Sequence, residues 1–199
     1  MNTLTKNLDL PSIPLKKSTI ENTQALDQAC KLYYEDVLTR FFNAIRKRDL
    51  KTVYQLSDNQ KLINARSING TTPLLLATTT NNPAMVELLL GSNADASLRN
   101  RRGETPLLRA AFWGYIQVAE LLIQKGNADV NETSPLGWTP LHKAAFQGRT
   151  DMVKLLLQYG ADPTPIVETI DGGFTPLKLA HWHRRDQTAR LLRKHGISS

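Results

Sequence analysis

The sequence predicts an all-α solenoid in which pairs of helices repeat along the chain. The triplet Thr-Pro-Leu begins at four threonines at nearly regular intervals, Thr72, Thr105, Thr139 and Thr175, with steps of 33, 34 and 36 residues. A leucine-rich run begins 16 residues after each threonine, at Leu88, Leu121, Leu155 and Leu191. A period of this length indicates a two-helix unit that is stable only when neighbouring units stack on it.

The first helix of each unit is expected to begin at its Thr-Pro pair. The threonine hydroxyl caps a helix, and proline suits the first helical position because its missing N–H would be unpaired there anyway. Small side chains follow, as at Ala110-Ala111 and Ala144-Ala145, and they let neighbouring helices approach closely. Gly114 and Gly148 are then expected to end the helix, because glycine accepts the left-handed conformation of a helix end.

The second helix of each unit contains the leucine run. Met152, Val153 and residues 155–157 form an apolar stripe at helical spacing. Gly91, Gly126 and Gly160 are expected to end these second helices. The extra residues of the longer units lie in 126–137 and 160–173, which are rich in the glycine, proline, asparagine, aspartate and threonine typical of loops.

A fainter unit precedes the four clear ones. Thr39 lies 33 residues before Thr72, and Ala44 occupies the position of the first alanine, but Arg40 replaces the proline. Residues 1–19 show no periodicity, and we expect an N-terminal disordered tail there. Residues 20–37 are predicted to form a helical cap over the first repeat, and the alternative is a helix that binds a partner.

The stretch from Gly137 to Ala145 reads Gly-Trp-Thr-Pro-Leu-His-Lys-Ala-Ala, and the same unit ends in Gly160-Ala161-Asp162. It resembles an ankyrin repeat. The resemblance covers about residues 38–199 and implies an ankyrin-repeat solenoid with β-hairpin-like fingers. Four clear repeats would follow a degenerate N-terminal capping repeat, with boundaries at 38–66, 67–99, 100–133, 134–169 and 170–199. The signature histidine occurs only as His142, which we expect to bond within its own repeat, and Asn81 and Arg184 replace the inter-helix glycine.

The composition excludes a mostly disordered chain and a collagen-like one. Apolar residues make up 41% of the 199 residues, as in a globular protein, and the net charge is +7. Apolar runs such as Leu74–Ala77 are far shorter than the roughly 20 residues that a membrane span needs. The single cysteine, Cys30, cannot form an internal disulfide. We therefore expect a cytoplasmic or nuclear protein.

Motifs for catalysis, cofactors or metals are not found. The sequence has no glycine-rich phosphate loop, no His-Glu-x-x-His and no Cys-x-x-Cys. His181 and His183 are two residues apart, so they do not share a helix face. Cys30 has no neighbour in the sequence that would activate it. We expect a protein that is not an enzyme, with no cofactor and no metal.

The resemblance implies that partners are held on the concave face, which is built by the residues before each Thr-Pro and after each Ala-Ala. Tryptophan and arginine are enriched in binding hot spots. The predicted partner-binding residues at these positions are Arg46, Lys47, Arg101, Arg102, Glu104, Phe112, Trp113, Trp138, Phe146, Phe174, Trp182 and His183. The alternative for Phe112 and Phe146 is packing between neighbouring repeats.

The predicted function is protein–protein interaction by a monomeric adaptor, scaffold or inhibitor. Its partner would be a protein with an acidic, aromatic or aliphatic surface or peptide. Residues 38–199 carry 21 basic and 13 acidic side chains. One basic cluster, Arg99-Arg101-Arg102, lies on the presumed binding edge, and the other, from Arg184 to Lys194, is interpreted as a solvated terminal cap.

Two alternatives remain open at this stage. The basic clusters could bind a polyanion, either nucleic acid or an acidic membrane. By analogy with other ankyrin modules, the chain could also be a secreted effector that acts in the cytosol of a host cell. Asn131 resembles the asparagine that protein hydroxylases modify in eukaryotic ankyrin repeats, and the alternative is an ordinary finger residue.

Overall fold

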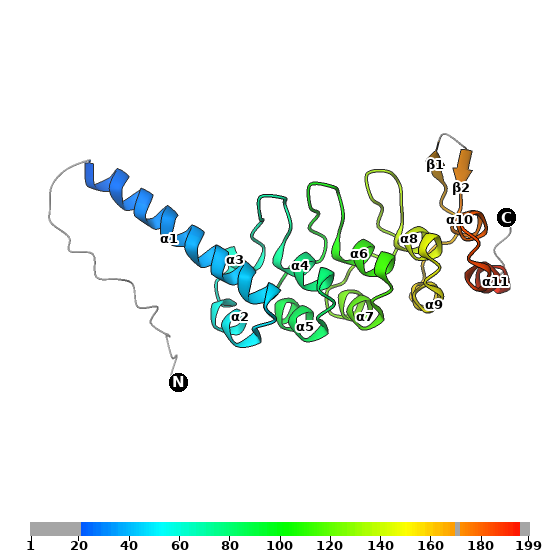
Figure 1. Cartoon of the computed structure of the whole chain (residues 1–199), viewed down its shortest axis with the longest axis horizontal. Coiled ribbons are helices and arrows are strands. Elements are labelled where there is room, and N and C mark those ends of the chain that lie inside the picture. Colours follow the sequence, from blue (N-terminus) through cyan, green and yellow to red (C-terminus); the bar gives the residue numbers. More distant parts are fainter. Residues whose placement is uncertain (1–20, 170–171, 196–199) are drawn as a thin grey trace. The chain divides into compact units, whose positions relative to one another are not determined.

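The computed structural model of the chain describes residues 21–169 and 172–195 (Figure 1). The predicted disordered tail, residues 1–19, lies outside this range. The chain divides into two units, Met1–Val37 and Leu38–Ser199, and the second contains the repeats. No helix within the described ranges is both long and apolar enough to cross a membrane.

Helix α1 (Glu21–Arg46) begins well before the first repeat. Thr39 therefore lies inside a helix, although the repeat register places a helix start there. The reason is Arg40. A proline in this place would push the preceding residue out of the helical conformation, whereas arginine lets the helix continue. Within the repeat unit, Phe41 and Ile45 of this helix are fully buried.

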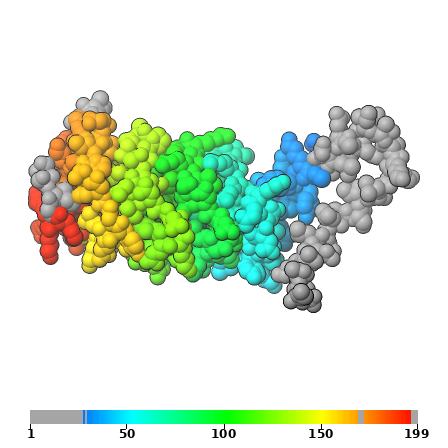
Figure 2. All heavy atoms as spheres, turned by 180° about the vertical axis from the view of Figure 1, so that it is seen from behind, coloured from blue at the N-terminus to red at the C-terminus, as the bar shows by residue number. Residues whose placement is uncertain are grey.

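The repeats form two rows of helices, which Figure 1 shows one above the other. The inner helices are α4 (Pro73–Thr79), α6 (Pro106–Trp113), α8 (Pro140–Gln147) and α10 (Pro176–Trp182). The outer helices are α5 (Pro83–Gly91), α7 (Ile116–Gln124), α9 (Thr150–Gln158) and α11 (Asp186–Lys194). In the first repeat the outer helix is α2 (Leu50–Leu56), and a short helix, α3 (Gln60–Ile63), follows it. Figure 2 shows the repeats as successive bands from cyan to red.

Each inner helix begins as the sequence predicts. The hydroxyl of its threonine accepts a hydrogen bond from the backbone N–H three residues later, at 3.2 Å in all four repeats. Such a cap stabilises a helix by about 1 kcal/mol. The alanine five residues after each threonine is fully buried, and these alanines are Ala77, Ala110, Ala144 and Ala180. Their small side chains let successive inner helices pack directly against one another.

Left-handed residues connect the helices of each pair. Gly114 and Gly148 have φ of 78° and 70°, and Asn81 and Arg184 adopt the same conformation, with φ of 46° and 54°. The substitutions for glycine thus preserve the turn. After the outer helices α5 and α7, the left-handed residues are Asn93 and Asn127, and not the glycines predicted to end these helices.

Gly126 is required for a different reason. A Cβ atom there would lie 2.7 Å from the carbonyl oxygen of Leu122, so a larger residue would collide with the helix end. Gly91 is the last residue of α5 and has open space around it. Gly160 does take the left-handed conformation after α9, with a φ of 82°.

The fingers between repeats are hairpin-like. In three of them a backbone N–H donates to the carbonyl four residues later, from Ser67 to Thr71, Asn100 to Glu104 and Ser134 to Trp138, at 2.9–3.0 Å, and a second backbone hydrogen bond from a glycine N–H closes the turn at 2.8–2.9 Å. The last finger, which contains inserted residues, forms strands β1 (Val167–Thr169) and β2 (Gly172–Phe174), paired antiparallel. The fingers place the residue before each Thr-Pro beside the start of the inner helix.

Arginine side chains tie consecutive repeats together at the inter-helix turns. Arg149 Nε donates to the carbonyl of Phe112 at 3.5 Å, and Arg185 Nε donates to the carbonyl of Phe146 at 3.2 Å. Each therefore caps the carboxyl end of the preceding inner helix, where the helix dipole favours a positive charge. Arg185 belongs to the cluster predicted to be a solvated cap, so at least this member has a structural role.

A second set of hydrogen bonds, made by Arg99, links the bases of consecutive fingers. Arg99 donates to the carbonyls of Gly103 at 3.0 Å and Thr133 at 2.7 Å, and it lies 4.0 Å from the carboxylate of Glu132. Glu132 accepts a hydrogen bond from the capping hydroxyl of Thr105, and burial raises its pKa. The side chain of Arg99 is thus engaged within the solenoid.

His142 bonds within its own repeat, as the resemblance implies, and also to the next one. Its Nδ1 lies 3.3 Å from the backbone nitrogen and 2.8 Å from the hydroxyl oxygen of Thr139, while Nε2 lies 3.2 Å from the carbonyl oxygen of Phe174. Burial lowers the pKa of the imidazole to about 4. The ring is therefore neutral, with Nδ1 accepting from the Thr139 N–H and Nε2–H donating to Phe174.

We predict that the repeats lose stability as the pH falls from 6.5 towards 4. In that window an unfolded His142 binds a proton and the folded one does not, so acid favours unfolding, by up to about 1.4 kcal/mol per pH unit. Urea unfolding across this range measures the slope. His142→Leu, which copies Leu75 and Leu108 of the earlier repeats, should flatten it. An unchanged slope in that variant would show that other groups carry the effect.

Candidate functional site

The candidate site is the face made by α6, α8, α10 and the finger residues before them. At the seventh position after each capping threonine lie Phe112, Phe146 and Trp182, and Trp138 and Phe174 precede the last two inner helices. These five side chains and Trp113, at the eighth position, are called the aromatic row below. All six come from repeats three to five, so the rings gather over the carboxyl-terminal part of the solenoid.

Phe146 lies at the centre of the aromatic row. Its ring centroid is 5.5 Å from that of Trp138 and 4.2 Å from that of His183, both edge to face. Trp138 also meets His142, with 6.2 Å between the centroids. Phe146 therefore packs against its own finger and against the next repeat, and it remains half-buried. Phe146 therefore packs between repeats and is also partly exposed on the surface, so it has features of both interpretations made from the sequence.

The ends of the aromatic row are more open. The centroids of Phe112 and Trp113 are 5.2 Å apart, and those of Phe174 and Trp182 are 5.6 Å apart. Trp113 is 43% exposed and Trp182 is 67% exposed, whereas Trp138 is half-buried. Two of the three indoles thus present large apolar surfaces that no other part of the described chain covers.

The sequence analysis missed two cations of this face, Lys143, which lies among the rings, and Arg109, which is paired with Glu104. Lys143 Nζ is 4.8 Å from the ring centroid of Trp138 and 6.0 Å from that of Phe112. Burial lowers the pKa of Lys143, and the negative charge of Glu104 opposes this shift. The Nη2 atom of Arg109 lies 2.6 Å from Oε2 of Glu104. Both cations stand four residues after a capping threonine, so helical spacing places them beside the seventh and eighth positions.

The predicted basic residues of the first repeat are separated from the aromatic row. Arg46 and Lys47 are exposed, and Arg46 donates to Asn43 Oδ1 at 3.0 Å. At the equivalent positions of the second repeat stand Thr79 and Thr80, whose hydroxyls donate to carbonyls of their own helix at 2.8 and 3.0 Å. The rings therefore do not continue across the second repeat to Arg46.

The third finger presents Arg101 and Arg102, both exposed. Together with Arg109 they surround a pocket of about 260 Å³ between the second and third fingers. The remaining lining residues are polar and uncharged, and they are Asn69, Thr71 and Asn100. Glu104, the other predicted member of this region, is half-buried and paired with Arg109.

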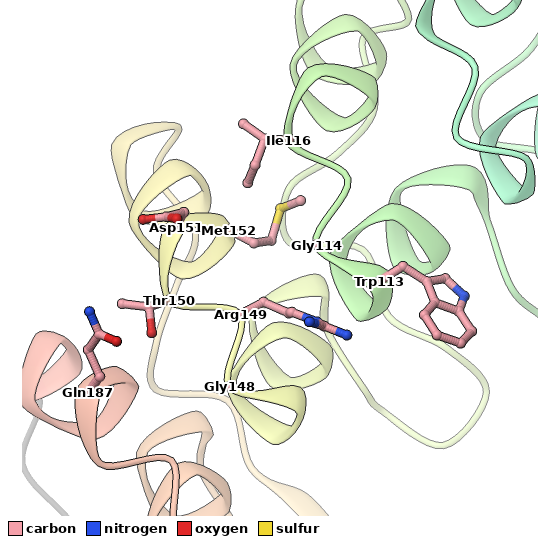
Figure 3. Close-up of a pocket in the computed structure, with 9 residues that line it drawn as sticks. All are labelled: Trp113, Gly114, Ile116, Gly148, Arg149, Thr150, Asp151, Met152 and Gln187. Carbon is pink, nitrogen blue, oxygen red and sulfur yellow. The ribbon is translucent and has the colours of Figure 1, made fainter.

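A second cavity, of about 330 Å³, lies beside the inter-helix turns (Figure 3). Its walls come from the turns after α6 and α8 and from Gln187 of α11. Figure 3 shows the ring of Trp113 pointing away from this cavity and the side chain of Arg149 extending towards the end of α6. Trp113 is the member of the aromatic row that lines this cavity, and because Arg149 already donates to Phe112 there, we assign the cavity to the contact between repeats.

Asn131 also has a structural role. Its side-chain oxygen accepts from the backbone N–H of Asp162 at 2.7 Å, and its amide donates to the carbonyl of Gly160 at 3.3 Å. Asn64 makes the equivalent bond to Asp95 at 2.9 Å. These asparagines join the base of one finger to the next. Among the residues that the structure describes, no group of three or more histidine, cysteine or acidic side chains is placed to hold a metal ion.

Comparison with known proteins places these features in context. A model of ankyrin repeats in three copies matches residues 41–134 and 126–199. The NAD-capped RNA hydrolase NUDT12 of Homo sapiens is 35% identical over 89 residues, which cover 44% of this chain and 19% of the hydrolase. The tyrosine-protein kinase HTK16 of Hydra vulgaris is 37% identical over 91 residues, covering 44% of this chain and 12% of the kinase.

Another relative is the NF-kappa-B inhibitor alpha of Homo sapiens. It is 29% identical over 113 residues, which cover 57% of this chain and 32% of the inhibitor. The chain thus spans less than a third of each of these three relatives. The matches to the hydrolase and the kinase cover only the repeat region of each protein, and only ankyrin repeats were detected in this chain.

The two kinds of tryptophan should respond differently to mutation. Trp138→Ala is expected to lower the free energy of unfolding by about 2 kcal/mol, because it removes contacts with Phe146 and with Lys143. Trp182→Ala, at a largely exposed position, is expected to cost about 0.5 kcal/mol or less. Urea unfolding followed by far-ultraviolet circular dichroism measures both. Equal losses would show that Trp182 also belongs to the core.

Proposed function

Because the chain belongs to the ankyrin-repeat family, we propose that it is a non-catalytic protein–protein interaction module that holds a partner on the aromatic row. It would act as an adaptor, a scaffold or an inhibitor. The proposal that it is not an enzyme rests on the chain's repeat content and on a surface made of rings and cations. Such a surface is suited to binding and provides no nucleophile paired with a base.

The observation that carries the proposal is the exposure of Trp113 and Trp182 on a face organised by ring contacts. A buried aromatic side chain contributes 150–250 Å² of contact area. Contacts such as those of Phe112 with Trp113 and of Phe174 with Trp182 restrict the indoles before a partner arrives. A surface that is already ordered loses less conformational entropy on binding, so more of the contact energy contributes to affinity.

The charges around the aromatic row favour a protein partner over a polyanion. Arg99, Arg149 and Arg185 bond to backbone carbonyls of neighbouring repeats, so their side chains do not form a free basic stripe. Lys143 lies between rings and is half-buried, where a cation supports an aromatic contact. A partner with aliphatic or aromatic side chains flanked by acidic ones complements this arrangement.

We predict that Trp113→Ala/Trp182→Ala abolishes capture of the partner without unfolding the chain. Affinity purification with mass spectrometry should recover the partner with the wild-type chain and lose it with the double variant. Each indole is expected to contribute about 2 kcal/mol or more to binding, about a thirtyfold change in Kd, measurable by calorimetry. A matched control is Lys154→Ala/Arg190→Ala, at exposed positions of the outer helices α9 and α11.

The competing polyanion hypothesis gives a different result in the same assay. Binding to nucleic acid or to an acidic membrane falls steeply with the logarithm of salt concentration, because counterions are released. A contact anchored by indoles changes far less. Capture that the tryptophan double variant retains, and that moderate salt removes, would contradict the proposed function.

A further inference from the structure

Backbone contacts between the second and third fingers fix the shape of the pocket that lies between them. The backbone N–H of Arg101 donates to the carbonyl of Asn69 at 3.3 Å and so joins the two fingers. Gly70 permits this approach, because a Cβ atom there would lie 3.0 Å from Arg101 N and 3.2 Å from Arg101 Cγ. Gly70 also has a left-handed φ of 71°. The finger geometry therefore fixes where the Arg101 side chain leaves the backbone.

The third finger is held in shape by Asn100. Its side-chain oxygen accepts from the backbone N–H groups of Arg102 at 2.9 Å and Glu104 at 3.0 Å, and its amide donates to Glu104 Oε2 at 3.0 Å. The same carboxylate oxygen accepts from Arg109 at 2.6 Å. Asn100 and Glu104 thus hold the third finger and Arg109 together at one pocket.

The pocket carries excess positive charge. Arg101 and Arg102 are exposed and form no ion pair within the described part of the chain, so three arginines are opposed by Glu104 alone. The Nε–H of Arg109 is buried and has no hydrogen-bond acceptor in that part of the chain. A buried donor without an acceptor costs free energy, so a ligand oxygen that reaches it would relieve that cost.

We propose that this pocket binds the carboxylate of an aspartate or glutamate side chain from the partner protein, an inference that rests on the proposed function. A planar carboxylate matches the forked donors of a guanidinium group. Glu104, in contact with Arg109, repels a phosphate dianion more strongly than a carboxylate with one negative charge. The lining amides and hydroxyl of Asn69, Thr71 and Asn100 provide further donors.

The position of the pocket also sets the spacing of the partner's residues. Arg109 and Phe112 are three residues apart on α6, so their side chains leave the same face of the helix about 5–6 Å apart. A bound carboxylate would therefore lie next to the start of the aromatic row. The partner segment should carry its acidic residue within a few positions of an aromatic or aliphatic residue.

Titration with acetate tests the pocket without a partner. The arginine Nε–H signals of the 15N-labelled chain are followed by NMR at constant ionic strength, with inorganic phosphate in a parallel series. Acetate should shift the Arg109 signal saturably. Arg101→Gln/Arg102→Gln should weaken this binding at least fivefold, while Arg190→Gln/Arg193→Gln, at exposed arginines of α11, should not.

Each result of this titration decides the proposal. No saturable shift with acetate, or the same affinity in Arg101→Gln/Arg102→Gln, overturns it. Saturation with phosphate but not with acetate overturns the assignment to a carboxylate. Unchanged urea unfolding of the Arg101→Gln/Arg102→Gln chain would show that a loss of binding comes from the missing guanidinium groups and not from unfolding.

Selection of displayed random peptides separates this inference from the proposed function. Wild-type chain should enrich peptides with an acidic residue close to an aromatic or aliphatic one, and Arg101→Gln/Arg102→Gln should lose only the acidic preference. Apolar enrichment without an acidic preference in the wild type overturns the pocket proposal and leaves the proposed function standing. Apolar enrichment that Trp113→Ala/Trp182→Ala leaves intact contradicts the proposed role of the aromatic row and leaves the pocket proposal standing.

Discussion

The direct packing of each inner helix against the next is the constraint on which the rest of this structure depends. Ala110 and Ala144 are fully buried between helices that belong to different repeats, so neither repeat can cover its apolar face alone. The same packing brings side chains from successive repeats into contact on the open face. Phe146 reaches the ring of His183 because α8 and α10 lie side by side. The framework and the candidate surface therefore share one cause.

Arginine serves two separate purposes in this chain, which the net charge alone does not distinguish. Arg149 and Arg185 satisfy carbonyl groups at the ends of inner helices, and Arg99 does so at the base of a finger. Their guanidinium groups are already hydrogen-bonded in the contacts between repeats. Arg101 and Arg102 have no such partners within the described chain and leave a local excess of charge at the third finger. Location and hydrogen bonding, and not the total of +7, indicate where an acidic ligand would bind.

Much of the fold follows from local sequence. Thr-Pro-Leu marks the start of four inner helices, because capping and the proline restriction act within a few residues. The same local logic explains the difference at the first repeat, since Arg40 lacks the restriction and α1 continues through Thr39. The left-handed turns at Asn81 and Arg184 were harder to predict, because the turn geometry is imposed by the two helices that the residue joins.

The site was less accessible from sequence than the fold. Exposed rings such as Trp113 and Trp182 could be identified from their repeat positions, which is a local property. Arg109 and Lys143 were missed, although their helical spacing places them on the same face. The role of Arg185 depends on a carbonyl 39 residues earlier in the chain, and such a contact appears only when successive repeats are stacked.

The distribution of inserted residues has an evolutionary consequence. The distance from each capping threonine to its leucine run is 16 residues in all four repeats, and the extra residues of the last repeat lie in and around the β1–β2 finger. Finger length therefore varies while the spacing within the helical framework stays constant. A lineage could alter the reach and chemistry of one finger at a time, and so exchange binding partners gradually without redesigning the scaffold.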